Sequence, residues 1–101
     1  IVEDNEELLQ ILNTLFIPFY QVILARNGKE GLQMANEEKP DLVVSDVMMP
    51  QMNGFELCRQ IKNDIQISHI PVILLTARYD QKGFSRGRMI ISVSLSTQKF
   101  Y

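Results

Sequence analysis

The sequence has little of several features that mark large classes of protein. Its single cysteine, Cys58, has no Cys or His nearby at metal-ligand spacing, so we expect no disulfide and a reducing, cytoplasmic setting. No apolar run approaches the roughly 20 residues that span a bilayer, and the start lacks the basic segment of a signal peptide. The chain does not begin with methionine, which leads us to expect a fragment.

The net charge of the chain is also small. Ten Lys and Arg against 12 Asp and Glu give a formal net charge of -2, and no segment gathers a basic cluster. Direct binding to nucleic acid or to a membrane is therefore not expected. With 101 residues, of which 46% are apolar, the chain has the size of one small domain.

Apolar periodicity predicts strands that alternate with helices. Asn5 is a suitable N-cap for a first helix that ends before Pro18, and a second helix ends at Lys39-Pro40. Short apolar runs such as 42–46 are typical of buried parallel strands. We therefore expect an α/β fold with right-handed crossovers. The expected strands cover residues 1–2, 20–25, 42–46 and 72–75.

A third helix is expected after the loop at 47–54. Its core side would carry Phe55, Leu57, Cys58 and Ile61, and its solvent side Glu56, Arg59 and Lys62. We assign no chemistry to Cys58 or His69. No Cys or His accompanies the loop methionines, so packing within the loop is expected for Met48, Met49 and Met52.

Polar residues follow the ends of the expected strands. Glu3 and Asp4 follow the first strand, Asp46 ends the third, and Thr76 ends the fourth. Parallel strands bring their carboxyl ends to one edge, so these groups are expected to converge. Converging carboxylates repel one another, and Mg²⁺ is the hard cation that usually holds them together. A carboxylate beside Mg²⁺ can attack a phosphoryl group. Taken alone, Asp46 would more often be a turn former or helix cap, the two acids after the first strand would be helix caps, and Thr76 would be an ordinary strand-end hydroxyl.

Four segments resemble the receiver domain of bacterial two-component response regulators. They are IVEDN at 1–5, LARNGKEGL at 24–32, PDLVVSDVMMPQMNGFELC at 40–58 and HIPVILLTA at 69–77. The third is the most specific, because an Asp after an apolar strand, followed by VMMP and NGFEL, is the family's phosphoacceptor signature. The resemblance implies a flavodoxin-like doubly wound parallel sheet, incomplete after the fourth strand. The last segment is also similar to receivers of hybrid sensor kinases joined to an AraC-type DNA-binding domain.

The resemblance implies a role for each residue of this acidic edge. Asp46 would accept a phosphoryl group from a histidine kinase, and Thr76 would hydrogen-bond the acyl phosphate as a switch. Pro50 and Gly54 would shape the loop over the site. The resemblance implies that the module is not an enzyme with catalytic turnover, although family members catalyse their own phosphorylation and hydrolysis. It would act through an output domain or protein absent from this chain. The implied Mg²⁺ ligands are Glu3, Asp4, Asp46 and the backbone carbonyl of Met48.

The resemblance ends at Ala77, which predicts a receiver unit over 1–77 and an aberrant tail over 78–101. Residues 89–96 alternate apolar residues with serine, so they are expected either to pair with the fourth strand as an edge or to be disordered. The family's lysine and aromatic switch residue would align near Ser94 and Ile91, and neither is the required type. A family-like ending, GADDYISKPFNTKIL, encoded with suitable codons and read one nucleotide late, gives residues 87–101. We therefore interpret the tail as out-of-frame translation after a small deletion between about residues 78 and 83.

Three alternatives stay open from the residues. The chain could be a pseudo-receiver that binds proteins without phosphorylation, or a fragment without function. It could also be a small Mg²⁺-dependent phosphatase of the aspartyl-phosphate type. That class needs a second Asp two residues after its nucleophile, where this chain has Met48.

Overall fold

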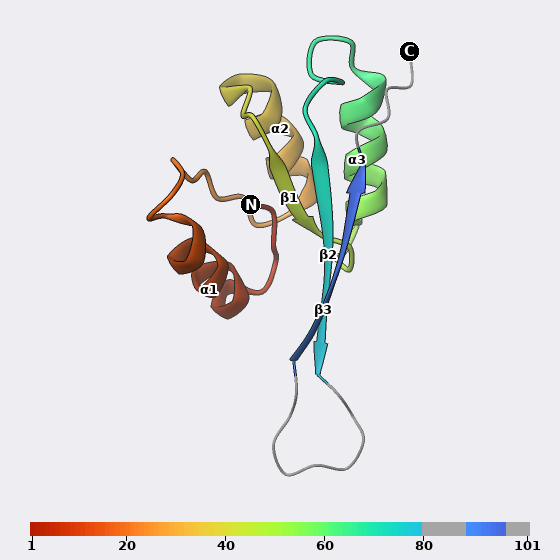
Figure 1. Ribbon diagram of the computed structural model, residues 1–101. Coiled ribbons are helices and arrows are strands. Elements are labelled where there is room, and N and C mark those ends of the chain that lie inside the picture. Colours follow the sequence, from red (N-terminus) through yellow and green to blue (C-terminus); the bar gives the residue numbers. More distant parts are fainter. Residues whose placement is uncertain (80–88, 97–101) are drawn as a thin grey trace.

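A computed structural model describes residues 1–79 and 89–96, and at 77–79 and 89–96 it describes the backbone alone. The parts of the expected aberrant tail at 80–88 and 97–101 lie outside the described residues. The described residues form three helices and a three-stranded sheet, whose arrangement is drawn in Figure 1. In chain order they are α1 (Glu6–Phe16), α2 (Gly28–Glu38), β1 (Val43–Asp46), α3 (Gly54–Asn63), β2 (Val72–Tyr79) and β3 (Met89–Ser96).

The sheet confirms the parallel arrangement that the sequence predicts. β1 and β2 are parallel neighbours, with Val43 opposite Val72 and Asp46 opposite Leu75. On the other side of β1, Val2 makes parallel bridges to both Ser45 and Ala25. The first expected strand therefore lies between residue 25 and β1, which is a doubly wound order.

The prediction of a strand over 20–25 is wrong, because only Ala25 forms a bridge there. The neighbouring segment, residues 1–2, is too short to form a ladder of backbone hydrogen bonds with residues 20–25. Its last contacts are the amide of Ala25 with the carbonyl of Ile1, at 2.8 Å, and the amino group of Ile1 with the carbonyl of Ile23, at 2.8 Å. Residues 20–22 have no neighbouring strand among the described residues.

Asparagine begins all three helices. The side-chain oxygens of Asn5, Asn27 and Asn53 accept hydrogen bonds from the backbone N–H three residues later, at 2.9, 2.8 and 2.9 Å. Each bond satisfies an amide that has no partner within its helix. The cap at Asn5 confirms the sequence prediction, and α2 ends where expected, at Lys39 in the left-handed conformation (φ 44°) before Pro40.

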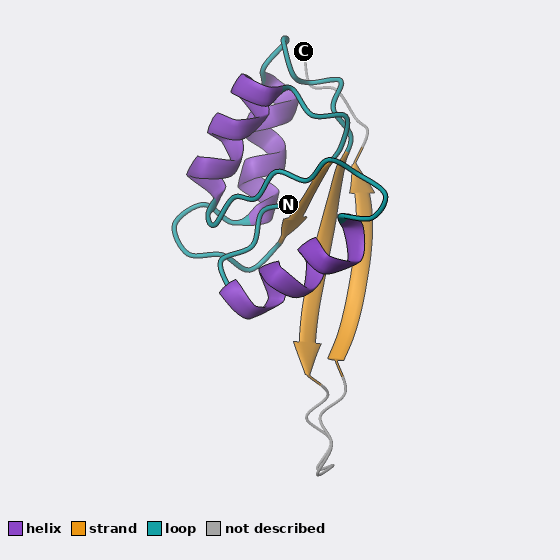
Figure 2. Ribbon diagram, turned by 90° about the vertical axis from the view of Figure 1, so that its left-hand side faces the viewer, coloured by secondary structure: helices purple, strands orange, loops and turns teal. Residues whose placement is uncertain are grey.

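The hydrophobic core lies between the sheet and the pair α2 and α3, which pack on the same face (Figure 2). Leu57 and Ile61 of α3 are fully buried, as expected, and the free thiol Cys58 is buried, with 7% exposure. Met49 is buried and Met52 packs against the core, but Met48 is exposed, so the prediction of loop packing is wrong for Met48. His69 is exposed. No helix in the described part of the chain is long and apolar enough to cross a membrane.

Two predictions for α3 are wrong. Phe55 is 58% exposed, whereas Lys62 is fully buried. These residues are seven apart and so lie on the same side of the helix. Only the Lys62 end of that side is covered, by the segment 64–70 with its buried Ile67 and Ile70.

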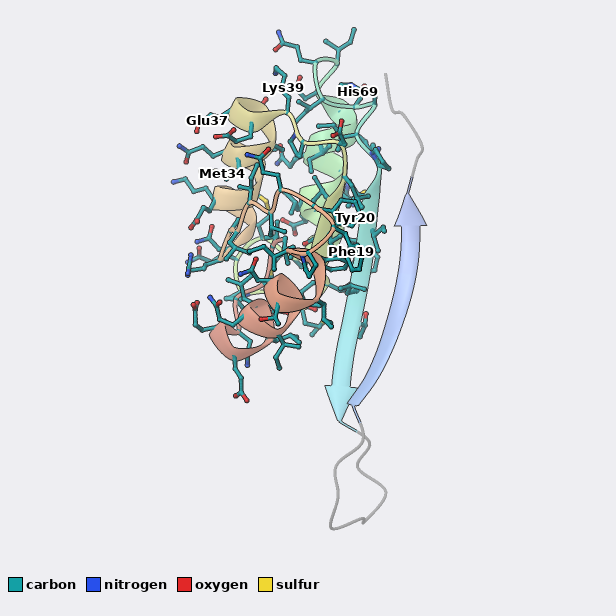
Figure 3. All side chains as sticks on the ribbon, turned by 60° about the vertical axis from the view of Figure 1, so that its left-hand side comes forward. Phe19, Tyr20, Met34, Glu37, Lys39 and His69 are labelled. Atoms are coloured by element: carbon teal, nitrogen blue, oxygen red, sulfur yellow. The ribbon has the colours of Figure 1, made fainter. Side chains whose placement is uncertain are left out.

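β3 forms an antiparallel pair with β2, with Val72 opposite Ser96 and Tyr79 opposite Met89. Of the two outcomes that the sequence left open for 89–96, the structure shows pairing with the fourth strand, and the sheet is mixed rather than wholly parallel. α1 buries only Leu9 and Leu12, while the apolar residues that follow it are exposed. Figure 3 labels two of these, Phe19 and Tyr20.

Candidate functional site

Three carboxyl groups meet at the carboxyl ends of the first strand and of β1. The amide of Asp46 donates to the carbonyl of Val2 at 2.9 Å, which fixes the end of β1 beside the backbone that leads into Glu3 and Asp4. Carboxylate oxygens of Glu3, Asp4 and Asp46 all lie within 4.8 Å of one another. The structure thus brings together the three acids that the sequence predicts.

Glu3 is the most deeply placed of the three, at 2% exposure. Its pKa is raised to about 7, mainly by burial and in part by the nearby Asp4 and Asp46. The amide of Asn5 donates to its Oε2 at 3.0 Å and opposes this effect. Near neutral pH the cluster therefore holds a carboxyl group that is only partly ionised.

Asp46 is half-buried at the end of β1. Burial is again the largest cause that raises its pKa, and the charge of Asp4 adds to it. The neighbouring backbone amides of Met48 and Val47 lower the pKa and partly offset this shift. Asp4, in contrast, is exposed to solvent.

The loop 47–54 is held tightly against the end of β1. The amide of Gly54 donates to the carbonyl of Val47 at 2.9 Å, and the amide of Val47 donates to the carbonyl of Leu75 at 3.0 Å. A Cβ atom at Gly54 would lie 2.3 Å from the carbonyl oxygen of Asp46, so no other residue fits without moving backbone. Gln51 takes up the turn with a positive φ of 69°, and the carbonyl of Pro50 accepts from the amide of Met52 at 2.8 Å.

Thr76 lies within β2, next to the end of β1, and the prediction that it ends the fourth strand is wrong because β2 continues to Tyr79. Asp46 is opposite Leu75 in the register of β1 and β2, so Thr76 is the next residue along β2. It is half-buried, and it is opposite Ser92 of β3. The positions expected for the family's lysine and aromatic switch residue, Ser94 and Ile91, fall within β3 opposite Leu74 and Ala77.

Two contacts near the site escape sequence reasoning. Arg26 forms a two-point ion pair with Glu6, with Nε to Oε2 at 3.0 Å and the second nitrogen to Oε1 at 3.2 Å. The buried hydroxyl of Ser45 donates to the carbonyl of Asp46 at 2.9 Å. The ion pair joins residues 20 positions apart, and no local spacing signals such a contact.

The donor set fits a small divalent cation. All three side chains offer oxygen atoms, which Mg²⁺ prefers, and they are close enough to share one ion. A cation would also relieve the repulsion that raises the pKa of Glu3 and Asp46. No soft ligand takes part in this cluster.

Comparison with known proteins gives a consistent result. A family model described as the response regulator receiver domain matches residues 1–90. The chain is 36% identical over 106 residues to the polar-differentiation response regulator DivK of Brucella anthropi, covering 99% of this chain and 86% of that protein. It is 49% identical over 91 residues to Histidine kinase P4 of Formosa agariphila, covering 86% of this chain. A hybrid signal transduction histidine kinase of Dictyostelium discoideum is 41% identical over 81 residues, or 80% of this chain. The chain spans only 7% and 5% of the lengths of these two kinases.

Solved structures agree with the sequence relatives. The N-terminal domain of a response regulator receiver protein from Methanoculleus marisnigri matches with a TM-score of 0.72 and 35% identity, covering 80% of this chain and 67% of that one. The receiver domain of a histidine kinase from Syntrophus aciditrophicus matches with a TM-score of 0.69 and 40% identity, over 80% and 62% of the two chains. The chain belongs to the response regulator receiver domain family.

Proposed function

We propose that Asp46 is the phosphoacceptor of this receiver domain and that a histidine kinase is its phosphodonor. The observation that carries this proposal is the convergence of Glu3, Asp4 and Asp46 within 4.8 Å at the edge of the sheet. The neighbouring backbone amides of Met48 and Val47 favour the ionised form of Asp46, which is the form that attacks. Kinases among the relatives support the choice of donor.

In the proposed transfer, an ionised oxygen of Asp46 attacks the phosphorus atom of a phosphohistidine. A new P–O bond forms as the P–N bond breaks, and the bond pair leaves on the imidazole nitrogen. Glu3, Asp4, Asp46 and the carbonyl of Met48 would hold Mg²⁺. When bound, this ion supplies positive charge that stabilises the phosphoryl oxygens.

Thr76 would act after transfer. Its place one residue beyond the partner of Asp46 suits a hydroxyl that donates to the acyl phosphate. Such a bond would add a contact that exists only in the phosphorylated state, and it would bias β2 and the backbone beyond it. Self-phosphorylation from small donors and slow self-hydrolysis would follow from the same site.

The wider setting is proposed on the same basis. We expect the module to act in the cytoplasm and to pass its signal to an output domain or protein outside this chain. The AraC-type output stays a prediction. The boundary at residue 77 and the out-of-frame origin of 78–101 also stay predictions, and an uninterrupted gene at the sequenced locus would contradict the frameshift.

Mg²⁺-dependent labelling with acetyl phosphate tests the proposal. We expect the intact mass to increase by one phosphoryl group in the wild type and in Asp41→Asn, an exposed acid that lies away from the cluster. The Asp46→Asn variant should gain nothing. Circular dichroism confirms that all three proteins are folded. A folded wild type that gains no mass would contradict the proposal and favour a phosphorylation-independent interaction module.

A further inference from the structure

The outer edge of β3 has no partner strand among the described residues. The sheet order ends at β3, and β3 pairs with β2 along all eight residues, Met89–Ser96. In Figure 3 the strand lies at the margin of the fold, with β2 on one side. Half of the backbone N–H and C=O groups of an edge strand point away from its neighbour, so β3 carries a row of groups available for pairing.

The sequence of this edge has none of the usual protections against pairing. Natural edge strands are commonly blocked by lysine, by proline, or by a bulge. Residues 89–96, MIISVSLS, contain no charged residue, no proline and no glycine, and the ladder to β2 runs in register without a bulge. The formal net charge of -2 also gives only weak repulsion between copies of the chain.

We propose that β3 is a self-association edge, at which β3 of a second copy pairs antiparallel to form a two-fold symmetric dimer with a continuous sheet. A two-fold axis perpendicular to the sheet keeps each face of β3 on the same side in both copies. Residues directly opposite each other then have the same parity in sequence. The axis therefore passes through a residue and not between two residues. The longest overlap of the two copies of Met89–Ser96 places it at residue 92 or residue 93.

The pattern of β3 makes this pairing self-complementary. With the axis at Val93, Val93 is opposite the partner's Val93, and Ile91 is opposite the partner's Leu95. On the other face, Ser92 is opposite the partner's Ser94. With the axis at residue 92, apolar positions on the odd-numbered face again match apolar positions. An edge strand in which apolar residues and serines alternate can thus pair with another copy of itself so that like side chains face each other.

The register between β2 and β3 gives a second reason why the partner of the free edge of β3 is another copy of this chain. Odd-numbered residues of β3 share a face with Ile73 and Leu75 of β2, which are half-buried. α2 and α3 pack on the opposite face, where Val72 and Leu74 are buried. Joining two sheets edge to edge would extend this apolar face across both copies, whereas a charged partner strand would interrupt it.

Engineered cysteines test the geometry directly. Under mild oxidation, we expect Val93→Cys or Ser92→Cys to form a disulfide-linked dimer rapidly, since one of these residues lies beside its own symmetry mate. Met89→Cys, at the end of the strand, is the matched control and should link much more slowly. The wild type, with only the buried Cys58, should not link. Equal rates at 89, 92 and 93 would contradict the symmetric pairing.

Oligomeric state gives an independent readout. Light scattering after size exclusion should report a dimer for the wild type and a monomer for Val93→Lys, because lysine at an edge opposes pairing. The control is Ile65→Lys, an exposed residue outside the sheet that should leave the dimer unchanged. Circular dichroism verifies that both variants are folded, and the cysteine series decides the question if Val93→Lys does not fold. A folded wild type that is monomeric at all concentrations would overturn the proposal.

Discussion

Gly54 shows how a single residue maintains the acidic edge. Its missing side chain allows α3 to begin directly beneath the carbonyl of Asp46, where a Cβ would lie 2.3 Å from that oxygen. We expect Gly54→Ala to move the end of β1, lower stability by about 1–3 kcal/mol and slow labelling of Asp46. Thermal unfolding and phosphorylation rates measure the two effects. Gln60→Ala, exposed on the same helix, is the control, and a Gly54→Ala variant that behaves like it would contradict this role.

The three carboxyl groups could be predicted from sequence because each follows a short apolar strand, and parallel topology then fixes their meeting point. The depth of Glu3 could not be predicted. Its burial depends on the tertiary structure, in which the chain turns toward the N-cap Asn5. The carboxylate of Glu3 accepts a hydrogen bond from the backbone amide of Asn5 there. The ion pair of Arg26 with Glu6 escaped because exposed pairs have no periodic signature.

At the scale of elements, Lys62 fastens α3 to the segment that enters β2. Its Nζ donates to the backbone carbonyls of Ser68, at 3.1 Å, and Ile70, and it is fully buried. We expect Lys62→Met to lower the free energy of unfolding by about 1–3 kcal/mol, because buried carbonyls would lose their donor. Arg59→Met, on the exposed side of the same helix, should change it by less than about 0.5 kcal/mol. Chemical denaturation compares them, and equal stabilities would show that the contacts of Lys62 contribute nothing.

The elements themselves were largely predictable, and the failures have a common cause. Periodicity and caps located α1, α2, α3, β1 and β2, because these signals are local to each segment. Lys62 and Phe55 were misplaced because the covering segment 64–70 carries no period of its own. The segment 20–25 failed as a strand because a strand needs a neighbour, and strand propensity alone does not provide one.

At the scale of the whole molecule, the acidic edge couples stability to pH. The pKa of Glu3 is raised to about 7 in the folded chain, from an ordinary value of 4.5, so the folded state binds the extra proton. Its contribution to stability is fully present below pH 4.5 and is lost as the pH rises through 7. Mg²⁺ bound to the ionised cluster would oppose this loss, because a ligand of the folded state stabilises it.

We therefore expect metal-free protein to lose stability from pH 5 to 8 more steeply than Glu3→Gln, whose amide does not titrate. The amino group of Ile1, whose pKa burial lowers, titrates in both proteins, so the difference between them isolates Glu3. Mg²⁺ should raise the unfolding midpoint of the wild type most at the alkaline end, and that of Glu3→Gln much less. Thermal melts in chelator and in Mg²⁺ measure both effects. Parallel pH profiles for the two proteins would show that Glu3 is ionised throughout and does not couple the site to folding.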